Sequence, residues 1–308
     1  MNEITIHAPA TVANLVCGFD VLGLCLEEPY DIMQVRLLDR RQVIIRTTDG
    51  FPLPSDPALN TAGAPLLEML ATLKQEVGFE VIITKRIKPG SGIGSSAASA
   101  AGAVVAANEL LGNIFSKEEL VRFALFGEKV ASGVKHADNI APCIYGGVTL
   151  IRSIFPLDII PISCPALYVS VLHPQIEVRT SDAREILRKE VLLKDAIRQW
   201  GNIAGLVAGL MKNDYELIGR SLEDVIIEPV RSILIPGFDQ IKTECKAAGA
   251  IGGGISGSGP SIFMLSKDEP TAKAVGAVMK SVYDHIGVNY HIYLTTVNHS
   301  GVRLKPGG

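Results

Sequence analysis

The chain has 308 residues, with 29 Lys and Arg against 32 Asp and Glu, and 47% of its residues are hydrophobic. This composition can build a sizeable core in one large or two ordinary domains, and it excludes a largely disordered chain. Because the net charge is −3, we expect no basic face and no nucleic-acid partner. The first residues lack the pattern of a secretory signal, and the uncharged stretch 89–108 is too rich in Ala, Gly and Ser to span a membrane, so we expect no membrane contact. The five cysteines are widely spaced and form no metal-binding pattern, so we expect reduced thiols in a cytoplasmic protein.

The first half of the chain alternates between strand-like and helix-like patterns. The two β-rich segments on either side of Asp39–Arg41 are typical of a hairpin. Ser116 and Glu119 form a capping-box pattern at the start of a helix. In chain order, the patterns predict a strand over Glu3–Ala8, a loop over Pro9–Gly23, strands over Tyr30–Leu38 and Gln42–Thr48, a helix over Asn60–Glu76, a strand over Phe79–Ile87, and helices over Ser96–Leu111 and from Ser116 toward Val130.

The second half continues the mixture after a break marked by three prolines. Pro156, Pro161 and Pro165 indicate a domain boundary, so we expect domains at 1–160 and 161–308. Because hairpins and crossovers occur together, the predicted class is α+β. The patterns predict strands over Ile144–Ile151, Leu167–Leu172, Ser261–Leu265 and Asn289–Thr296, a helical zone over 181–212 interrupted by Gly201, and helices over Gly237–Ala248 and Thr271–Ile286.

A glycine-rich loop lies between the predicted strand that ends at Ile87 and the predicted helix that begins at Ser96. Glycines alternate at positions 90, 92 and 94, and a Ser-Ser pair follows them. Residues without a Cβ let the backbone turn sharply, and the free N–H groups at a helix start bind anions such as phosphate. Ser95 occupies the position at which a Walker A loop has Lys, and no strand follows the helix as a dinucleotide fingerprint requires. The loop therefore indicates phosphate binding of another kind, or a tight turn without a ligand.

Three motifs in one order resemble the GHMP small-molecule kinases. Residues 89–99 resemble the phosphate-binding motif of these enzymes, residues 9–20 the N-terminal substrate motif, and residues 252–260 the C-terminal glycine motif. The resemblance implies an N-terminal nucleotide domain with a left-handed crossover, a ferredoxin-like C-terminal domain, and an active site between the two. It implies ATP and Mg²⁺ as cofactors, and, by analogy, a homodimer. It assigns nucleotide binding to Asn60, Pro89, Gly90, Ser91, Gly92, Ile93, Gly94, Ser95, Ser96 and Ser99.

Within the superfamily, the motifs resemble most closely the homoserine kinase family. The pattern at 9–20, the segment from Gly127 to Asn139, and the segment from His173 to Arg184 carry this resemblance. It implies ATP-dependent phosphorylation of the hydroxyl of L-homoserine, a step toward threonine. Val16-Cys17 departs from the family, which usually has Gly-Pro before Gly18.

Homoserine is a zwitterion, so its ammonium needs oxygen acceptors and its carboxylate needs donors such as an Arg fork. The resemblance assigns substrate binding to Asn14, Asp20, His136, Arg184, Arg231 and Gly257. For Asn14 and Asp20 the alternative is ordinary turn chemistry, and for each Arg it is a solvated surface charge. His136 either orients the substrate or has a structural role.

The resemblance assigns catalysis to Glu128, Asn139 and Thr180, and metal binding to Ser96 and Glu128. Because an amide such as Asn139 cannot accept a proton usefully at pH 7, we expect direct attack of the hydroxyl, assisted by positioning and electrostatic stabilisation. Lys85, Arg86 and Lys88 flank the loop, and we expect them to be exposed. Two alternatives stay open: another GHMP kinase, of the mevalonate or isoprenoid-precursor type, and a non-catalytic nucleotide or metabolite sensor on the same fold.

Overall fold

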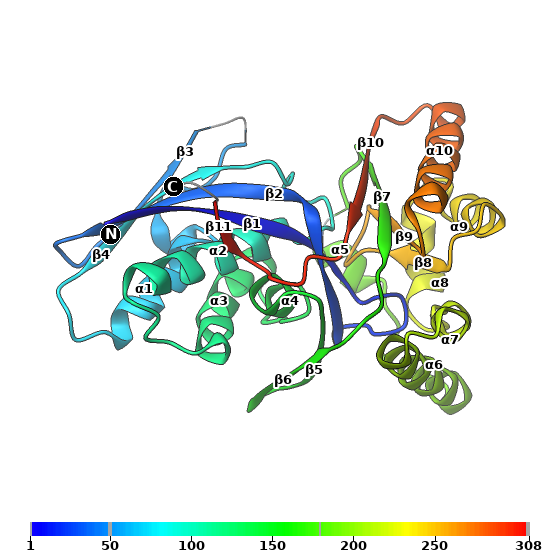
Figure 1. The fold of residues 1–308 in the computed structure, drawn as a ribbon, viewed down its shortest axis with the longest axis horizontal. Coiled ribbons are helices and arrows are strands. Elements are labelled where there is room, and N and C mark those ends of the chain that lie inside the picture. Colours follow the sequence, from blue (N-terminus) through cyan, green and yellow to red (C-terminus); the bar gives the residue numbers. More distant parts are fainter. Residues whose placement is uncertain (1, 49–50, 179, 306–308) are drawn as a thin grey trace.

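The computed structural model describes residues 2–48, 51–178 and 180–305, except for the side chains of Thr180 and Ser181. Two sheets organise the chain (Figure 1). The larger one contains long β1 and β2 strands, and it has helices α1–α4 on one side in this view. Its strands within the described residues are β1 (Glu3–Ala13), β2 (Leu22–Leu38), β3 (Val43–Thr47), β4 (Gly78–Thr84), β5 (Val148–Ile154), β6 (Leu157–Ile162) and β11 (Arg303–Leu304).

The order of strands in the larger sheet differs from the prediction at one place. The two strands around Asp39–Arg41 do not form a hairpin, because β4 lies between β2 and β3. β4 runs antiparallel to β2 and parallel to β3. Along the chain, α1 (Gly63–Thr72) lies between β3 and β4. Local alternation and a short polar turn favour a hairpin, but the strand that fills the gap comes from much further along the chain. The left-handed crossover stays a prediction.

Helix α2 (Ser95–Leu110) packs directly on the larger sheet, and its small residues make this possible. Nearly all of its residues are buried. A Cβ at Gly102 would stand 2.5 Å from Met33 Sδ and 2.9 Å from Ala8 Cβ, so only glycine fits between the helix and β1 and β2. The N-terminal helices and turns are η1 (Pro57–Leu59), α1, α2, α3 (Lys117–Ser132) and α4 (Ile140–Tyr145).

The second sheet has the order β10-β7-β9-β8, with every neighbouring pair antiparallel. With α9 before β8 and α10 between β9 and β10, this is the arrangement of a ferredoxin-like domain, as predicted. Its strands are β7 (Tyr168–Pro174), β8 (Gly252–Ile255), β9 (Ile262–Ser266) and β10 (Tyr290–Thr296), and its helices are α5 (Thr180–Glu185), α6 (Leu193–Lys212), α7 (Tyr215–Ser221), α8 (Glu228–Arg231), η2 (Ser232–Leu234), α9 (Phe238–Ala247) and α10 (Glu269–Ile286).

Two further expectations about local structure are wrong. The strand predicted over Ile144–Ile151 begins only at Val148, because its first two residues belong to α4. Gly201 does not interrupt its helix, because the break between α5 and α6 lies earlier, at residues 186–192.

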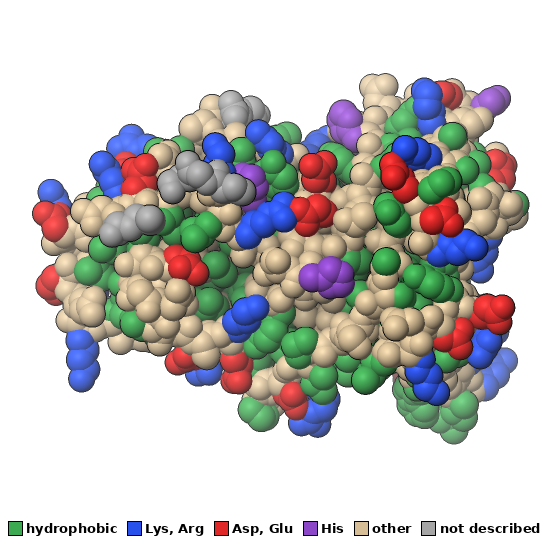
Figure 2. Space-filling model, in the orientation of Figure 1, with side chains coloured by type: hydrophobic (Ala, Val, Ile, Leu, Met, Phe, Trp, Pro, Cys, Tyr) green, Lys and Arg blue, Asp and Glu red, His purple; other side chains and the backbone are tan. Residues whose placement is uncertain are grey.

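Two buried clusters of apolar side chains form the core, a larger one under the first sheet and a smaller one around α9, α10 and the second sheet. The predicted boundary between residues 160 and 161 falls inside β6, which pairs with β5 as far as Ile162. After β10 the chain returns to the larger sheet as β11 beside β1. Acidic and basic side chains are interspersed over the face in Figure 2. Among the described residues, no helix is long and apolar enough to cross a membrane.

Candidate active site

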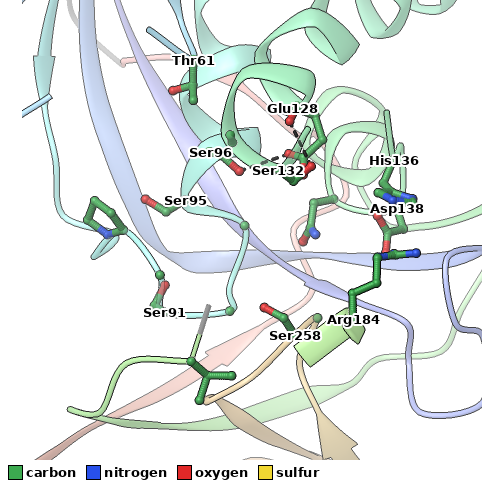
Figure 3. A pocket seen from close by; sticks show the side chains of 18 of the residues that line it. Thr61, Ser91, Ser95, Ser96, Glu128, Ser132, His136, Asp138, Arg184 and Ser258 are labelled. Carbon is green, nitrogen blue, oxygen red and sulfur yellow. Dashed lines mark hydrogen bonds between the residues drawn. The ribbon is translucent and has the colours of Figure 1, made fainter. Parts of the chain in front are cut away.

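A cleft of about 560 Å³ lies where the loop after β4, the start of α2, α3 and α5 meet the glycine loop after β8. Figure 3 shows Ser96, Glu128 and Ser132 gathered on one side of it, with His136, Asp138 and Arg184 on another. The predicted site residues that line the cleft are Asn14, Asp20, Pro89, Gly90, Ser91, Gly92, Gly94, Ser95, Ser96, Ser99, Glu128, His136, Asn139, Arg184, Arg231 and Gly257.

The glycine-rich loop reaches the cleft with positive φ at Gly90, Gly92 and Gly94, which only glycine adopts without strain. Gly94 is the N-cap of α2, and a Cβ there would stand 2.0 Å from Thr11 Oγ1. The loop is therefore held against β1, and the first N–H groups of α2 lie at the cleft. This arrangement suits a bound phosphate, because those donors have no partner inside the helix and the helix dipole adds positive potential.

The C-terminal glycine motif holds the phosphate loop in place. Ser256 Oγ donates a hydrogen bond to the Gly92 carbonyl at 2.7 Å, and Ser261 Oγ donates to the Ser91 carbonyl at 2.6 Å. A Cβ at Gly92 would stand 2.4 Å from the Gly259 carbonyl oxygen. The two glycine motifs, far apart in the sequence, thus form one packed joint between the two sheets.

Lys85 is buried, which corrects the expectation that it is an exposed basic residue at a strand end. Its ammonium group pairs with Asp31, and it donates to the Ser95 carbonyl at 2.9 Å and to Ser99 Oγ at 3.1 Å. Asp31 in turn accepts hydrogen bonds from the backbone N–H groups of Arg86 and Ile87. The pair therefore joins the two ends of the phosphate loop. The Lys85 ammonium stabilises the shape of this loop instead of binding a phosphate.

Glu128 on α3 faces Ser96, whose hydroxyl donates to Glu128 Oε2 at 3.2 Å. Gly127 lets α3 pack closely against Thr61, because a Cβ at position 127 would stand 2.3 Å from the Thr61 carbonyl oxygen. Burial raises the pKa of the Glu128 carboxyl, while hydrogen bonds from Ser132 and Ser96 oppose the rise. Glu128 forms no ion pair with any described residue. A carboxylate of this kind, beside a hydroxyl and a candidate phosphate site, fits Mg²⁺, which takes one or two carboxylates and keeps several waters. Within the part of the chain that the structure describes, no cluster of three His, Cys, Asp or Glu forms a metal cage of protein groups alone.

Opposite charges meet at the other end of the cleft. One guanidinium nitrogen of Arg184 lies 3.0 and 3.1 Å from the two carboxylate oxygens of Asp20. His136 Nδ1 lies 3.6 Å from Asp20 Oδ1, and burial is the main cause that lowers the pKa of His136. Asn14 supports this corner, because its Oδ1 accepts from the Asp20 N–H at 3.1 Å and its Nδ2 donates to the Gly257 carbonyl at 2.9 Å.

Phe19, which sequence reasoning did not single out, lies close to both predicted arginines. The Arg184 and Arg231 guanidinium carbons lie 5.4 and 4.9 Å from the centre of its ring. Arg231 is almost fully buried, and it donates to the carbonyls of Ala183 and Gly257. Burial, followed by the nearby Arg184 charge, lowers the pKa of Arg231 to about 10, so it still carries its charge at neutral pH.

Asp138 is a cleft residue that sequence reasoning missed. It is buried, and this burial, with the charges of Asp20 and Glu128, raises the pKa of Asp138 to about 8. The adjacent Asn139 has its side-chain oxygen Oδ1 engaged, since Thr11 Oγ1 donates a hydrogen bond to it at 2.7 Å. The signal that could have found Asp138 is a carboxylate between a His and an Asn within an otherwise apolar turn.

Three of the predicted site residues do not line the cleft with a described side chain. Asn60 has its amide turned to its own loop, where it donates to the Pro54 carbonyl and accepts from the N–H groups of Ala62 and Gly63, and the next residue, Thr61, lines the cleft. Ile93 is fully buried, and its carbonyl accepts from the Thr11 N–H. Thr180 begins α5, but its side chain lies outside the described part of the structure.

Comparison with known proteins gives the class of protein that this fold and cleft define. The family model described as GHMP kinases N terminal domain matches residues 62–147, and that of GHMP kinases C terminal matches residues 206–285. A mevalonate kinase from L. major, 18% identical with a TM-score of 0.68 over 96% of both chains, shares the fold.

Curated relatives narrow the class. A homoserine kinase of Chloroherpeton thalassium is 48% identical over 99% of this chain and 100% of its own, and one of Methanocella arvoryzae is 40% identical over 99% and 98%. The crystal structure of homoserine kinase from Cytophaga hutchinsonii, 49% identical, has a TM-score of 0.95 over 99% of this chain and 98% of its own. This chain belongs to the homoserine kinase family of the GHMP kinases.

Proposed function

We propose that this chain is an ATP-dependent kinase that transfers the γ-phosphoryl group to the hydroxyl of L-homoserine, in the cytoplasm. The single observation that carries the proposal is the charge pattern of the cleft. Its phosphate loop lies at one end, and at the other end two acidic side chains, Asp20 and Asp138, lie with two guanidiniums, Arg184 and Arg231. A zwitterion with a short hydroxyl arm matches this pattern, and similar proteins are named homoserine kinase.

The substrate end is prepared for a zwitterion. Asp20 and Arg184 pair with each other in the structure. A bound zwitterion would replace both partners with groups of the same charge, because its ammonium would bind Asp20 and its carboxylate would bind Arg184. Asp138, with its raised pKa, is mostly protonated at pH 7. A substrate ammonium beside Asp138 would favour its ionised form. Asp138 would therefore become negatively charged only when a substrate with an ammonium group binds.

The phosphate end supplies position and electrostatic stabilisation. The N–H groups of the 90–96 loop and of α2 hold the triphosphate, and Ser96 and Glu128 would hold Mg²⁺, which neutralises charge on the phosphates. We propose that the substrate hydroxyl attacks directly, with Asn139 positioning it through the amide nitrogen. His136, whose pKa is lowered, is mostly neutral at pH 7 and orients the substrate beside Asp20. The catalytic assignment of Thr180 stays a prediction.

A coupled ADP-release assay tests the proposal. L-Homoserine is compared with 4-hydroxybutyrate, which lacks the ammonium, and 3-aminopropan-1-ol, which lacks the carboxylate. We expect each analogue to lose at least about hundredfold in kcat/KM, because each lacks one of the two charged groups that the Asp20–Arg184 corner of the cleft would bind. Arg184→Gln should remove most of the discrimination against 3-aminopropan-1-ol, whereas Arg122→Gln, on the exposed face of α3, should leave it unchanged. Equal turnover of homoserine and either analogue contradicts the proposal.

A further inference from the structure

Thr11 lies near the end of β1, where that strand meets the phosphate loop. Its side chain is fully buried, with 0% of the residue exposed. The register of β1 against β2 shifts between Pro9 and Thr11, and an irregularity of this kind changes the direction in which a side chain points. A buried hydroxyl costs free energy unless its proton finds an acceptor, so the partner of Thr11 is informative.

The hydroxyl of Thr11 has one hydrogen-bond partner among the described residues. Thr11 Oγ1 donates to Asn139 Oδ1 at 2.7 Å, although the two residues lie 128 positions apart in the sequence. Asn139 is the N-cap of α4, but its side chain makes no capping hydrogen bond there. Because Thr11 holds the oxygen of this amide, the nitrogen Nδ2 is the atom left for the cleft, which Asn139 lines.

Thr11 also contacts the phosphate loop, through two different atoms. Its backbone N–H donates to the Ile93 carbonyl at 3.1 Å. Its Oγ1 lies so close to Gly94 that a Cβ at position 94 would stand 2.0 Å from it, and the same Cβ would stand 3.1 Å from Asn139 Oδ1. The Thr11 hydroxyl, the N-cap of α2 and the amide of Asn139 therefore meet at one point, where β1, α2 and α4 pack together (Figure 1).

The hydrogen bond from Thr11 also determines which end of the amide faces the cleft. An amide oxygen only accepts hydrogen bonds and an amide nitrogen only donates them. If the Asn139 amide were turned by half a rotation, its nitrogen would face Thr11, and the Thr11 proton would have no acceptor among the described residues. The buried hydroxyl therefore directs Nδ2 toward the cleft. There it can hold the oxygen of a substrate hydroxyl but cannot take the proton of that group, which agrees with direct attack.

We propose that Thr11 is a positioning residue for phosphoryl transfer, which fixes the amide of Asn139 relative to the phosphate loop. The inference rests on the proposed function, in which Asn139 positions the attacking hydroxyl. Reaction requires the attacking oxygen and the phosphorus to lie about 3–3.5 Å apart, and a displacement of about 1 Å can reduce turnover about hundredfold. Because Thr11 contacts both the amide and the loop, it sets the separation between the group that holds the hydroxyl and the loop that holds the triphosphate.

Thr11→Val tests the inference, because it removes the hydroxyl and keeps the size and branching of the side chain. We expect kcat to fall by about 10- to 100-fold, since Asn139 loses the group that orients it. KM for ATP should change by less than about twofold, because the hydrogen bond from the backbone N–H of residue 11 to Ile93 remains. Thr11→Ser retains the hydroxyl and should keep kcat within about threefold of the wild type. Thr11→Ala provides a second variant without the hydroxyl.

Thr149 provides the matched control. It is a fully buried threonine of β5 in the same sheet, and its hydroxyl has no hydrogen-bond partner in the part of the chain that the structure describes. Thr149→Val should therefore leave kcat unchanged, and circular dichroism identifies the variants that are folded. In an Asn139→Ala background, Thr11→Val should lower kcat further by less than about threefold, because the residue through which Thr11 acts is gone.

The inference is overturned if the folded variants without the Thr11 hydroxyl keep the kcat of the wild type, or if Thr11→Ser loses as much as Thr11→Val. An equal loss with and without Asn139 would overturn it too, as would a higher KM for ATP with kcat unchanged, which would limit the hydroxyl to supporting the phosphate loop. The kinetics use the alcohol that the wild type phosphorylates. Transfer to an alcohol other than homoserine contradicts the proposed function while Thr11 is still tested, and a wild type that transfers to no alcohol overturns both.

Discussion

At the scale of single residues, the substrate end of the cleft depends on side chains that control one another's charge. Phe19 offers the face of its ring to both Arg184 and Arg231, and Asp20 pairs with Arg184. Two like-charged guanidiniums repel each other, so an aromatic ring near both of them and a carboxylate paired with Arg184 stabilise their close approach. Phe19 is therefore a positioning residue for the proposed carboxylate site.

Phe19→Leu should raise KM for homoserine by roughly tenfold, because a cation–π contact contributes about 0.5–2 kcal/mol. KM for ATP should stay unchanged, since the phosphate loop lies at the other end of the cleft. Phe19→Tyr retains the ring and serves as the matched control. Steady-state kinetics in both substrates separates the effects, and an equal rise in both KM values would show a general structural defect instead.

Asp138 gives the fold a distinct pH dependence. Its pKa rises from the usual 3.8 to about 8 in the folded chain, so between these values the folded state holds a proton that the unfolded state releases. The free energy of unfolding therefore falls with rising pH in this window, by up to about 1.4 kcal/mol per pH unit from this group. Asp138→Asn should flatten the slope. Urea unfolding of the wild type and of the variant, from about pH 5 to about pH 8, measures the free energy of unfolding of each. Identical pH slopes would contradict the raised pKa of Asp138.

At the scale of elements, the joint between the two glycine motifs determines the shape of the phosphate loop. Gly90 and Gly92 have nearly the same backbone conformation, with φ of 75° and 80°. They differ in surroundings, because a Cβ at Gly92 would meet the Gly259 carbonyl and one at Gly90 would meet nothing within 4 Å. The pair therefore separates backbone strain from packing between the two sheets.

Gly92→Ala should destabilise the protein by about 1–3 kcal/mol more than Gly90→Ala, because overpacking adds to the strain that both variants share. It should also raise KM for ATP more strongly, since the loop must move. Thermal unfolding and ATP kinetics of the two variants check this. If the two variants lose the same stability, the joint does not hold the loop.

The elements also show what the sequence can predict. The capping box at Ser116 and Glu119 is confirmed, and so is the sharp turning of the backbone at the three glycines before α2, because local chemistry determines both. The predicted hairpin of β2 and β3 and the predicted start of a strand at Ile144 were wrong, because strand pairing and burial depend on segments distant in the sequence. The burial of Lys85 and Asp138 escaped prediction for the same reason: their local sequence does not show what covers them.

At the scale of the whole molecule, the cleft exists because two sheets each contribute a loop to it. The motifs at 9–20, 89–99 and 252–260 were recognisable separately, and the prediction that they meet is confirmed by the cleft that residues of the first two motifs and Gly257 line together. Neither the packing of Gly92 on Gly259 nor the hydrogen bond from Thr11 to Asn139 could be predicted, since both depend on how distant segments meet in the folded chain.

The central claim is that this cleft selects a small zwitterionic alcohol and phosphorylates it. The most direct measurement is a competition: the protein is incubated with ATP, Mg²⁺ and equal concentrations of L-homoserine, mevalonate and galactose, and the phosphorylated products are identified by mass spectrometry. The account predicts O-phospho-L-homoserine as the dominant product, formed in step with ADP. A dominant phosphomevalonate or sugar phosphate, or nucleotide binding without any transfer, would contradict it.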